Sequence, residues 1–369
     1  MSKFHDLRVA EIRQETKDCV SIVLEVPAVL AKDFTFTQGQ YLTFKKVIAG
    51  EEVRRSYSIC SSPLDGELRV AVKKIEGGKM STFLNSEVKV GDSLSTMVPF
   101  GNFYTTLNTF NRNAYYLFAA GSGITPILSH IKTILAKEPQ AKLVLFYGNR
   151  SEDEIIFKSA LENLEKQYVN RLKLVYCFTK PKLQYEPLHL GRIDGKKAEA
   201  LLEQFTIPGL NAVYFACGPG ELMLNVKEVL AKRKVDANKV HMEFFTTPVE
   251  GMVEGGAGTV KGSSGVGGVV SVGGPVASVV TFICDGDEKT VNVPANKKLL
   301  EAALEANIDA SYACKGGSCC TRRAKITEGK ADMVVNYALM DDEVTDGFVL
   351  TCQAFATTST LRVDYDRGK

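Results

Sequence analysis

Residues 114–137 read AYYLFAAGSGITPILSHIKTILAK. An apolar run leads into a glycine-rich turn, and apolar residues then recur at helical spacing, at Ile127, Leu128, Ile131, Ile134 and Leu135. A buried strand that enters a helix through such a turn is the unit of a parallel α/β sheet. Gly121 and Gly123 let the backbone approach an anion, and Thr125 adds a hydroxyl to that turn. The stretch therefore predicts both a fold class and an anion site.

The alternation of strand and helix continues beyond this stretch. Strands are predicted at KLVLFYG, RLKLVYCF and AVYFACG, and helices at residues 153–168, at 198–205 and after Glu221. The first hundred residues have another rhythm, in which short alternating runs at 19–26, 66–75 and 87–94 are separated by turn residues. That rhythm is typical of an antiparallel barrel or sandwich.

The composition changes after residue 250. Ten of the 24 residues from Gly251 to Gly274 are glycine, which predicts a linker. The uncharged stretch 262–284 is long enough to cross a bilayer, but its glycines and Pro275 make it a poor helix and favour a linker that runs into a strand at 279–283. A helix is expected at 299–306. We expect a barrel at 1–110, an α/β domain at 111–246, a linker at 247–277 and a small α+β domain at 278–369.

Global properties exclude several classes of protein. A chain of 369 residues suits two or three domains, and a net charge of +2 gives no reason to expect a nucleic-acid partner. The N-terminus lacks the apolar core of a signal peptide, so a cytoplasmic protein is expected. Four of the nine cysteines lie within 314–352, which indicates metal binding rather than a disulfide framework. Residues 278–366 carry nine Lys/Arg against fourteen Asp/Glu, so this acidic portion could dock on a basic surface.

Two motifs in the first hundred residues suit a flavin dinucleotide. In RSYSICSSP, which begins at Arg55, an arginine can hold a pyrophosphate, Tyr57 can cover a flat ring and Ser58 can bond its edge. An ordinary strand is the alternative. In GGKMSTFL, residues 77–84, glycines and hydroxyls at a helix start offer donors to phosphate.

Two further motifs suit a pyridine nucleotide. Arg150 and Ser151 follow the second strand of the parallel sheet, where an acidic residue would favour NADH and an arginine favours the 2′-phosphate of NADPH. NADPH is therefore expected, with NADH possible. Cys217, Gly218 and Pro219 close the third strand, where a small side chain permits two flat rings to approach; a buried structural cysteine is the alternative.

These motifs occur in the order and spacing of the ferredoxin-NADP reductase family, which the chain resembles from about Phe4 to Phe245. The resemblance implies Arg55 on the FAD pyrophosphate, Tyr57 on the isoalloxazine, Ser58 at its reactive edge and Cys217 near the nicotinamide. It places the other cofactor-binding residues at Gly78, Ser81, Thr82, Gly121, Gly123, Thr125, Arg150, Ser151, Gly218 and Pro219. Either Phe244 or Phe245 is expected near the flavin.

The segment ACKGGSCCTRRAKI, with LTCQ beyond it, resembles a plant-type ferredoxin domain with a β-grasp fold. That family binds a 2Fe-2S cluster through C-x4-C-x2-C and a distant cysteine. The resemblance implies Cys314, Cys319 and Cys352 as ligands. The remaining position is Arg322, whose protonated guanidinium has no lone pair for iron, and the neighbouring Cys320 could replace it only if the loop rearranged.

The whole arrangement is similar to the reductase components of oxygenases of the phenylacetyl-CoA epoxidase type. It implies electron transfer from NADPH through FAD to a 2Fe-2S centre and on to an oxygenase in phenylacetate catabolism. Because of Arg322, a cluster-free flavin reductase or NAD(P)H oxidase is an alternative, and a C-terminal domain that only docks a partner is another. None of the four histidines is assigned a role, and His130 is expected to be exposed on its helix.

Overall fold

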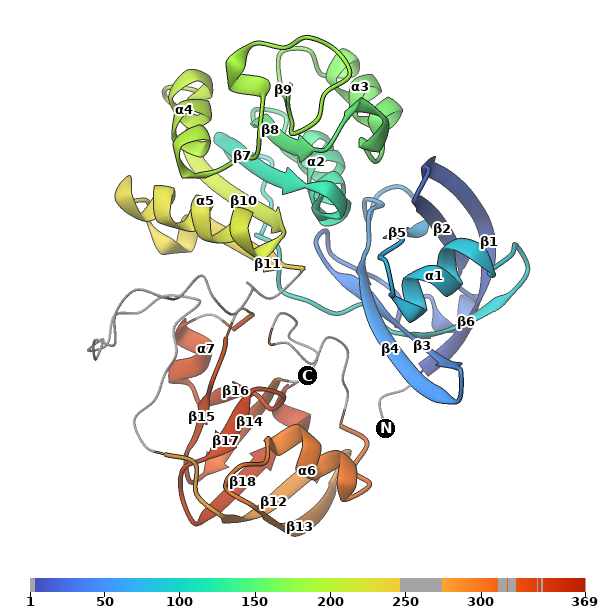
Figure 1. Ribbon diagram of the computed structural model, residues 1–369, viewed down its shortest axis with the longest axis vertical. Coiled ribbons are helices and arrows are strands. Elements are labelled where there is room, and N and C mark those ends of the chain that lie inside the picture. The colour runs from blue at the N-terminus through green and yellow to red at the C-terminus, as the bar shows by residue number, and fades with distance from the viewer. Residues whose placement is uncertain are drawn as a thin grey trace. The chain divides into compact units, whose positions relative to one another are not determined.

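The computed structural model describes residues 4–245, 274–310, 317, 323–336, 338–339 and 341–368. Residues 4–245 form one compact unit, and the described residues from 274 onward belong to a second (Figure 1). Most of the predicted linker, 247–277, lies outside the described residues.

The first unit contains an antiparallel lobe and a parallel lobe (Figure 1). The elements of the antiparallel lobe are β1 (Phe4–Thr16), β2 (Cys19–Glu25), η1 (Ala28–Leu30), β3 (Tyr41–Ile48), β4 (Glu51–Ser58), β5 (Leu68–Lys73), α1 (Lys79–Ser86) and β6 (Ser93–Met97). Those of the parallel lobe are β7 (Asn113–Ala120), η2 (Gly121–Gly123), α2 (Ile124–Lys137), β8 (Lys142–Asn149), η3 (Glu152–Glu154), α3 (Lys158–Gln167), β9 (Leu172–Phe178), η4 (Pro187–His189), α4 (Gly195–Phe205), β10 (Asn211–Gly218), α5 (Gly220–Lys232), η5 (Ala237–Lys239) and β11 (Val240–Phe244).

The antiparallel lobe is the expected barrel. Its strand order is β4-β3-β6-β1-β2-β5, and a bridge between Ile59 and Val70 joins the two edges. Alternating apolar residues of β1 to β5 fill the interior, because successive side chains of a strand point to opposite faces. The alternating run at 87–94 is a strand only at its end: Asp92 accepts the backbone N–H of Lys89 at 2.9 Å in a turn, so β6 begins at Ser93.

The parallel lobe has the strand order β11-β10-β7-β8-β9. The chain runs outward from β7 to β9 and then returns to β10 on the other side of β7. The order therefore reverses between β7 and β10, and open α/β sheets bind ligands at the carboxyl ends of strands at such a point. Residues of α2 and α3 join one core with Tyr115, Leu117 and Tyr147, whereas Phe146 of the opposite face contacts Phe205 of α4.

The helix predictions differ in their outcome. Helix α2 spans Ile124–Lys137, as its apolar spacing indicates. The prediction of one helix over 153–168 is wrong in its first part, because Phe157 has a left-handed backbone with φ of 63° and α3 begins after it. Ile155, Ile156 and Phe157 are all buried, and three consecutive buried residues do not fit one face of a helix.

A buried row of polar contacts joins the two lobes, and we call it the seam. The hydroxyl of Ser129 on α2 donates to the carbonyl of Ser61 at 2.6 Å, and the hydroxyls of Ser62 and Thr133 are 2.9 Å apart. Lys132 pairs with Asp65 at its rim. Residues 129, 132 and 133 share one face of α2, so that face binds the loop after β4. Each of these buried hydroxyl and carbonyl groups therefore has a hydrogen-bond partner in the other lobe.

His130 corrects the expectation of an exposed helical residue, because its side chain is fully buried. Its Nε2 lies 2.8 Å from the carbonyl oxygen of Phe103, so Nε2 carries the proton, and its ring centroid is 4.4 Å from that of Phe215. His241 stacks on the same Phe215 ring at 4.6 Å. Helix α2 is covered by the sheet and by the loop around Phe103, which a helical pattern alone does not indicate. Desolvation lowers the pKa of His130 to about 3 and that of His241 to about 4.

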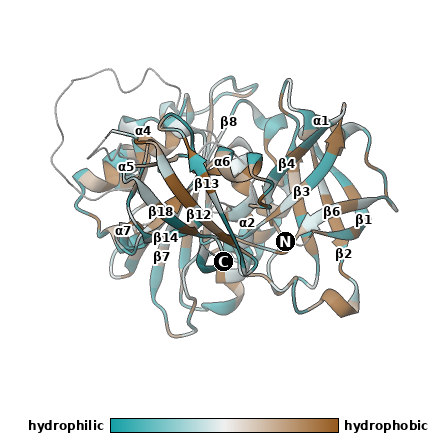
Figure 2. Cartoon of the chain, turned by 90° about the horizontal axis from the view of Figure 1, so that it is seen from below, coloured by the Kyte–Doolittle hydropathy of each residue, from teal (hydrophilic) through white to brown (hydrophobic). Residues whose placement is uncertain are grey.

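The second unit contains β12 (Ser278–Cys284), β13 (Asp287–Val293), α6 (Leu299–Glu305), β14 (Arg323–Glu328), β15 (Ala331–Met333), α7 (Asp341–Thr345), β16 (Phe348–Leu350), β17 (Ala354–Ala356), β18 (Thr360–Asp364) and η7 (Asp366–Gly368). The main sheet has the order β13-β12-β18-β14-β16, and β15 pairs with β17. Much of β12 is brown in Figure 2, in line with its apolar sequence, and Leu299, Leu300 and Ala303 of α6 are buried. No helix among the described residues is long and apolar enough to span a membrane.

Buried His130 and half-buried His241 predict the response of the protein to acid. Their folded-state pKa values are depressed, so below about pH 6.5 the unfolded chain binds more protons than the folded chain. The stability they contribute is present above that pH and is lost as the pH falls toward 4 and 3. His130→Gln keeps a side-chain donor for Phe103 but does not titrate, so thermal unfolding of this variant should depend less on pH between 6.5 and 4. Equal acid sensitivity of both proteins would contradict the assignment.

Candidate flavin and nicotinamide site

The end of β4 carries the first group of predicted residues. Arg55 is exposed, and its Nη1 donates to the carbonyl of Arg54 at 2.7 Å, while Tyr57 is half-buried with its ring centroid 5.7 Å from that of Phe44. Arg55 and Tyr57 are two apart on a strand and share one face. Ser58 ends the strand with its side chain buried.

The turn before α1 is the one predicted to bind a pyrophosphate. Gly78 precedes the helix, and its carbonyl accepts the N–H of Thr82 at 3.0 Å and the hydroxyl of Ser81 at 3.2 Å. A Cβ at Gly78 would lie 2.5 Å from Ser81 Oγ, so a side chain there would displace the Ser81 hydroxyl from the turn. The Ser81 hydroxyl also accepts the N–H of Ile75, so it holds the turn itself. With Arg55 and Tyr57, this turn suits the phosphates and ring of FAD.

The turns after β7 and β10 contact each other through their backbones. A Cβ at Gly123 would lie 2.1 Å from the carbonyl oxygen of Cys217, so only glycine fits there. Gly218 has φ of 154° and lies against Ala120, and Pro219 directly precedes α5. The Thr125 hydroxyl donates to the carbonyl of Ser122 at 3.0 Å. The predicted residues Gly121, Gly123, Thr125, Cys217, Gly218 and Pro219 therefore gather at the point where the strand order reverses.

Glu243 on β11 is the functional candidate that the motifs did not reveal. Its Oε2 accepts the hydroxyl of Ser58 at 3.2 Å, and the thiol of Cys217 lies 3.9 Å from the same oxygen. Glu243 faces Cys217 in the parallel register of β10 and β11, while Ser58 comes from the other lobe. The structure thus brings Ser58 and Cys217 together through a carboxyl group. A single acid within the otherwise apolar end of VHMEFF is the signal that could have identified it.

The protonation of this group follows from its surroundings. Desolvation raises the pKa of Glu243 to about 8, although the Ser58 and Cys217 hydrogen bonds act in the opposite direction. Burial, with Glu243 beside it, raises the pKa of the Cys217 thiol well above its usual value. With a pKa of about 8, most of the half-buried Glu243 carboxyl is protonated at pH 7, and the thiol and hydroxyl beside it are uncharged.

The phenylalanines that follow Glu243 differ in exposure. Phe244 is buried, whereas 37% of Phe245 is exposed and its backbone N–H donates to the carbonyl of Gly218 at 3.2 Å. Phe245 is therefore the one whose ring remains accessible to a ligand.

Arg150 and Ser151 lie apart from this cluster, at the carboxyl end of β8. The Arg150 side chain is 63% exposed and its Nε is 3.9 Å from Glu154. The three acidic residues that follow Ser151 all have partners in the structure. Glu152 accepts the backbone N–H groups of Lys182 and Leu183 at 3.0–3.1 Å, Asp153 pairs with Lys182, and Glu154 lies 3.4 Å from Lys73.

The predicted cluster ligands are only partly described. Cys314 and Cys319 lie outside the described residues, as do Cys320 and Arg322. Cys352 is buried in the turn between β16 and β17. Gly317, from the predicted ligand loop, has φ of 74°, and a Cβ there would lie 3.0 Å from the side chain of Gln353, next to Cys352. The described part of the loop thus adjoins Cys352, the most distant of the three predicted ligand cysteines, but Arg322 leaves the donor set one thiolate short.

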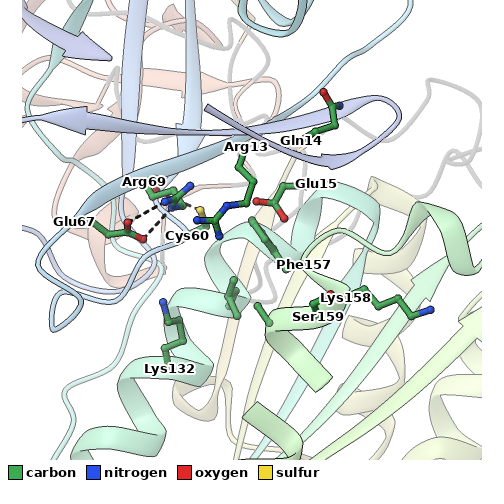
Figure 3. A pocket seen from close by; sticks show the side chains of 12 residues that line it. Arg13, Gln14, Glu15, Cys60, Glu67, Arg69, Lys132, Phe157, Lys158 and Ser159 are labelled. Atoms are coloured by element: carbon green, nitrogen blue, oxygen red, sulfur yellow. Dashed lines mark hydrogen bonds and ion pairs between the residues drawn. The ribbon is translucent and has the colours of Figure 1, made fainter. Parts of the chain in front are cut away.

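A separate cavity of about 290 Å³ lies between the barrel and helices α2 and α3 (Figure 3). Its lining includes Arg13, Arg69 and Lys132, which pair with Glu11, Glu67 and Asp65. None of the predicted site residues lines it. We place the chemistry at the turns after β4, β7 and β10, because the glycine contacts and Glu243 converge there.

Known proteins resemble the chain over all three parts. Residues 6–104 match the oxidoreductase FAD-binding domain, 117–228 the oxidoreductase NAD-binding domain, and 282–357 the 2Fe-2S iron-sulfur cluster binding domain. A component chain of 1,2-phenylacetyl-CoA epoxidase from Escherichia coli (strain K12) is 40% identical over 368 residues, which are 99% of each chain. The ferredoxin reductase component of 3-ketosteroid-9-alpha-monooxygenase from Mycobacterium tuberculosis (strain CDC 1551 / Oshkosh) is 32% identical over 98% of this chain and 96% of that protein.

The fold also matches solved structures. Phthalate dioxygenase reductase, described as a modular structure for electron transfer from pyridine nucleotides to [2Fe-2S], has a TM-score of 0.54 at 22% identity over 98% of both chains. The fold and site define a flavin-dependent pyridine-nucleotide oxidoreductase joined to an iron-sulfur domain. The chain belongs to the family of oxygenase reductases that includes this component of the phenylacetyl-CoA epoxidase.

The raised pKa of Glu243 predicts how stability changes with pH. In the unfolded chain this carboxyl titrates near 4.5, so between about pH 4.5 and 8 the folded state holds the proton that the unfolded state has lost. Stability therefore falls through that window as the pH rises. Glu243→Gln keeps an acceptor for Ser58 without titrating, so the melting temperature of the FAD-loaded variant should fall less than that of the wild type from pH 5 to 8. Parallel melting curves across this range would exclude a neutral Glu243.

Proposed function

We propose that this protein takes electrons from NADPH through FAD and passes them, by way of its 2Fe-2S domain, to an oxygenase component. The observation that supports this most directly is the convergence of Ser58 and Cys217 on Glu243, where the flavin and nucleotide turns meet. The named activities of the relatives support the oxygenase as acceptor, and the Escherichia coli relative points to a phenylacetyl-CoA epoxidase. Action in the cytoplasm fits this partner.

The residues of the site have separate roles in this proposal. Arg55 and the turn from Gly78 to Thr82 hold the pyrophosphate of FAD, and Tyr57 covers its ring. Bound FAD supplies the chemistry, since it accepts a hydride from a nicotinamide and releases the two electrons singly. Ser58 and Cys217 hold the reacting edges, and Gly218 lets the nicotinamide approach closely. Phe245 covers the exposed side of the ring.

Glu243 keeps this site free of net charge. The carboxyl accepts both the Ser58 hydroxyl and the Cys217 thiol, so these two side chains are fixed although they come from different lobes. A carboxylate there would repel electron density moving toward the flavin, whereas the neutral acid does not.

NADPH is the proposed coenzyme because of the surroundings of Arg150. Glu152, Asp153 and Glu154 each face backbone N–H groups or lysines, which compete with a ribose 2′-hydroxyl for their oxygens. The exposed guanidinium of Arg150, followed by Ser151, suits a 2′-phosphate instead. NADH is the alternative donor.

One observation favours a second candidate function. Because Arg322 occupies a ligand position, the chain could act as a cluster-free flavin reductase or NAD(P)H oxidase, with the C-terminal domain serving only to dock a partner. Iron content per FAD separates the two functions.

Arg150→Ala tests the coenzyme assignment. Loss of an exposed charge-assisted contact should raise the Michaelis constant for NADPH about tenfold and leave that for NADH nearly unchanged. Steady-state reduction of ferricyanide at equal FAD content measures both constants. A common increase with both coenzymes would mean that Arg150 does not recognise the 2′-phosphate.

Arg322→Cys tests the path of the electrons. Because Arg322 leaves one iron a ligand short, the proposed path should be only partly occupied: FAD should be reduced rapidly, iron and acid-labile sulfide should be substoichiometric to FAD, and a one-electron protein acceptor should be reduced slowly. The cysteine variant should gain both cluster and transfer. Arg322→Ser removes the charge without adding a thiolate and should gain neither. A full, stable cluster in the Arg322 protein would refute this, and Cys320→Ser would then show whether Cys320 is the fourth ligand.

A further inference from the structure

Tyr147 is a buried residue that the site described above does not use. It lies on β8 in register with Ala119 of β7, and its side chain is fully buried. Its hydroxyl donates to the carbonyl oxygen of Gly121 at 3.0 Å. Desolvation raises the pKa of this phenol well above its ordinary value, so the hydroxyl keeps its proton and remains a donor.

This hydrogen bond fixes the orientation of one peptide in the turn after β7. The Gly121 carbonyl also accepts the backbone N–H of Ile124, and Gly121 has φ of 53°, in the left-handed region. A peptide is planar and trans, so its carbonyl and the following N–H point in opposite directions. With the carbonyl held against Tyr147, the N–H of Ser122 points away from the core. If the Gly121 peptide were turned the other way, its carbonyl oxygen would point at a bound phosphate and repel it.

The backbone of Ile156 lies close enough to the same phenol to act on its pKa, in the direction opposite to desolvation. Ile156 closely follows the segment from Arg150 to Glu154. The phenol therefore lies between the turn after β7 and the segment after β8. These are the two places at which the parallel lobe offers groups for the pyrophosphate and the adenosine ribose of a dinucleotide.

We propose that Tyr147 is a positioning residue for the pyridine nucleotide: its buried hydroxyl holds the Gly121 carbonyl inward, so that the Ser122 N–H is presented to the coenzyme pyrophosphate. The inference rests on the proposed function and deepens it. Tyr147 acts through the backbone and touches no reacting atom. Its effect is therefore on binding, and it is the same for NADPH and NADH because both contain the pyrophosphate.

Tyr147→Phe in the full-length, FAD-loaded protein tests this role, since it removes the hydroxyl and keeps the ring. Loss of one neutral hydrogen bond predicts a three- to tenfold rise, as an order of magnitude, in the Michaelis constants for NADPH and NADH, with kcat within about twofold. The dissociation constant of ADP-ribose should rise by the same factor. This ligand carries the pyrophosphate and cannot be oxidised, so its binding is measured without turnover.

Tyr116→Phe is the matched control. Tyr116 is also buried, on the neighbouring strand β7, and its hydroxyl accepts the backbone N–H of Ile207 at 2.7 Å. The control loses a buried hydrogen bond of the same kind on the opposite face of the sheet, so its binding constants should remain those of the wild type even if its melting temperature falls.

Three results would overturn the proposal: unchanged ADP-ribose binding in Tyr147→Phe, a fall in kcat alone, or an equal loss of binding in Tyr116→Phe. If Tyr147→Phe loses FAD, amide exchange of residues 119–125 is measured in the fraction that retains FAD. Exchange that is faster than in the wild type, and that ADP-ribose slows less, would support the proposal. Unchanged exchange would reject the proposal. A wild type that binds ADP-ribose but oxidises neither coenzyme would count against the proposed function and leave the role of Tyr147 standing.

Discussion

The hydrogen bond from Ser129 to the carbonyl of Ser61 is the constraint on which the site depends. It and the contact between Ser62 and Thr133 are buried, so breaking either leaves polar groups without water or partners. Both place α2 against the loop that directly follows β4. Because Ser58 ends β4 and the turn of Gly121 and Gly123 begins α2, the seam fixes the flavin and nucleotide turns relative to each other.

The chemistry of the site and the stability of the fold make opposite demands on Glu243. Enclosing a carboxyl costs free energy once it ionises, and the two hydrogen bonds from Ser58 and Cys217 offset that cost only in part. The rest of this cost is offset by the burial of apolar side chains on β10 and β11, among them Phe215 and Phe244, which stabilises the fold. An enzyme that moves a hydride gains from an acid that stays neutral, since its field on the reacting atoms is then small.

The sequence predicted those features that arise from local pattern. Apolar spacing defined α2 to the residue, and glycines between strand and helix located the nucleotide turns. What the sequence could not predict depends on contacts between the lobes. A helix pattern shows one apolar face, so nothing indicated that a second surface covers His130. Glu243 has no motif of its own, since its role comes from the register of β11 against β10 and from Ser58, which is 185 residues away in the chain.

The contact between Gly123 and Cys217 has a consequence for protein engineering. The two backbones are so close that no side chain fits between them, so the turns after β7 and β10 must be inherited together. A chimera that exchanges only one of these turns with a relative would combine two backbones that did not evolve against each other. Recombination points that preserve this pair lie outside the segment from β7 to β10, and the parallel lobe is therefore the smallest exchangeable part of the nucleotide site.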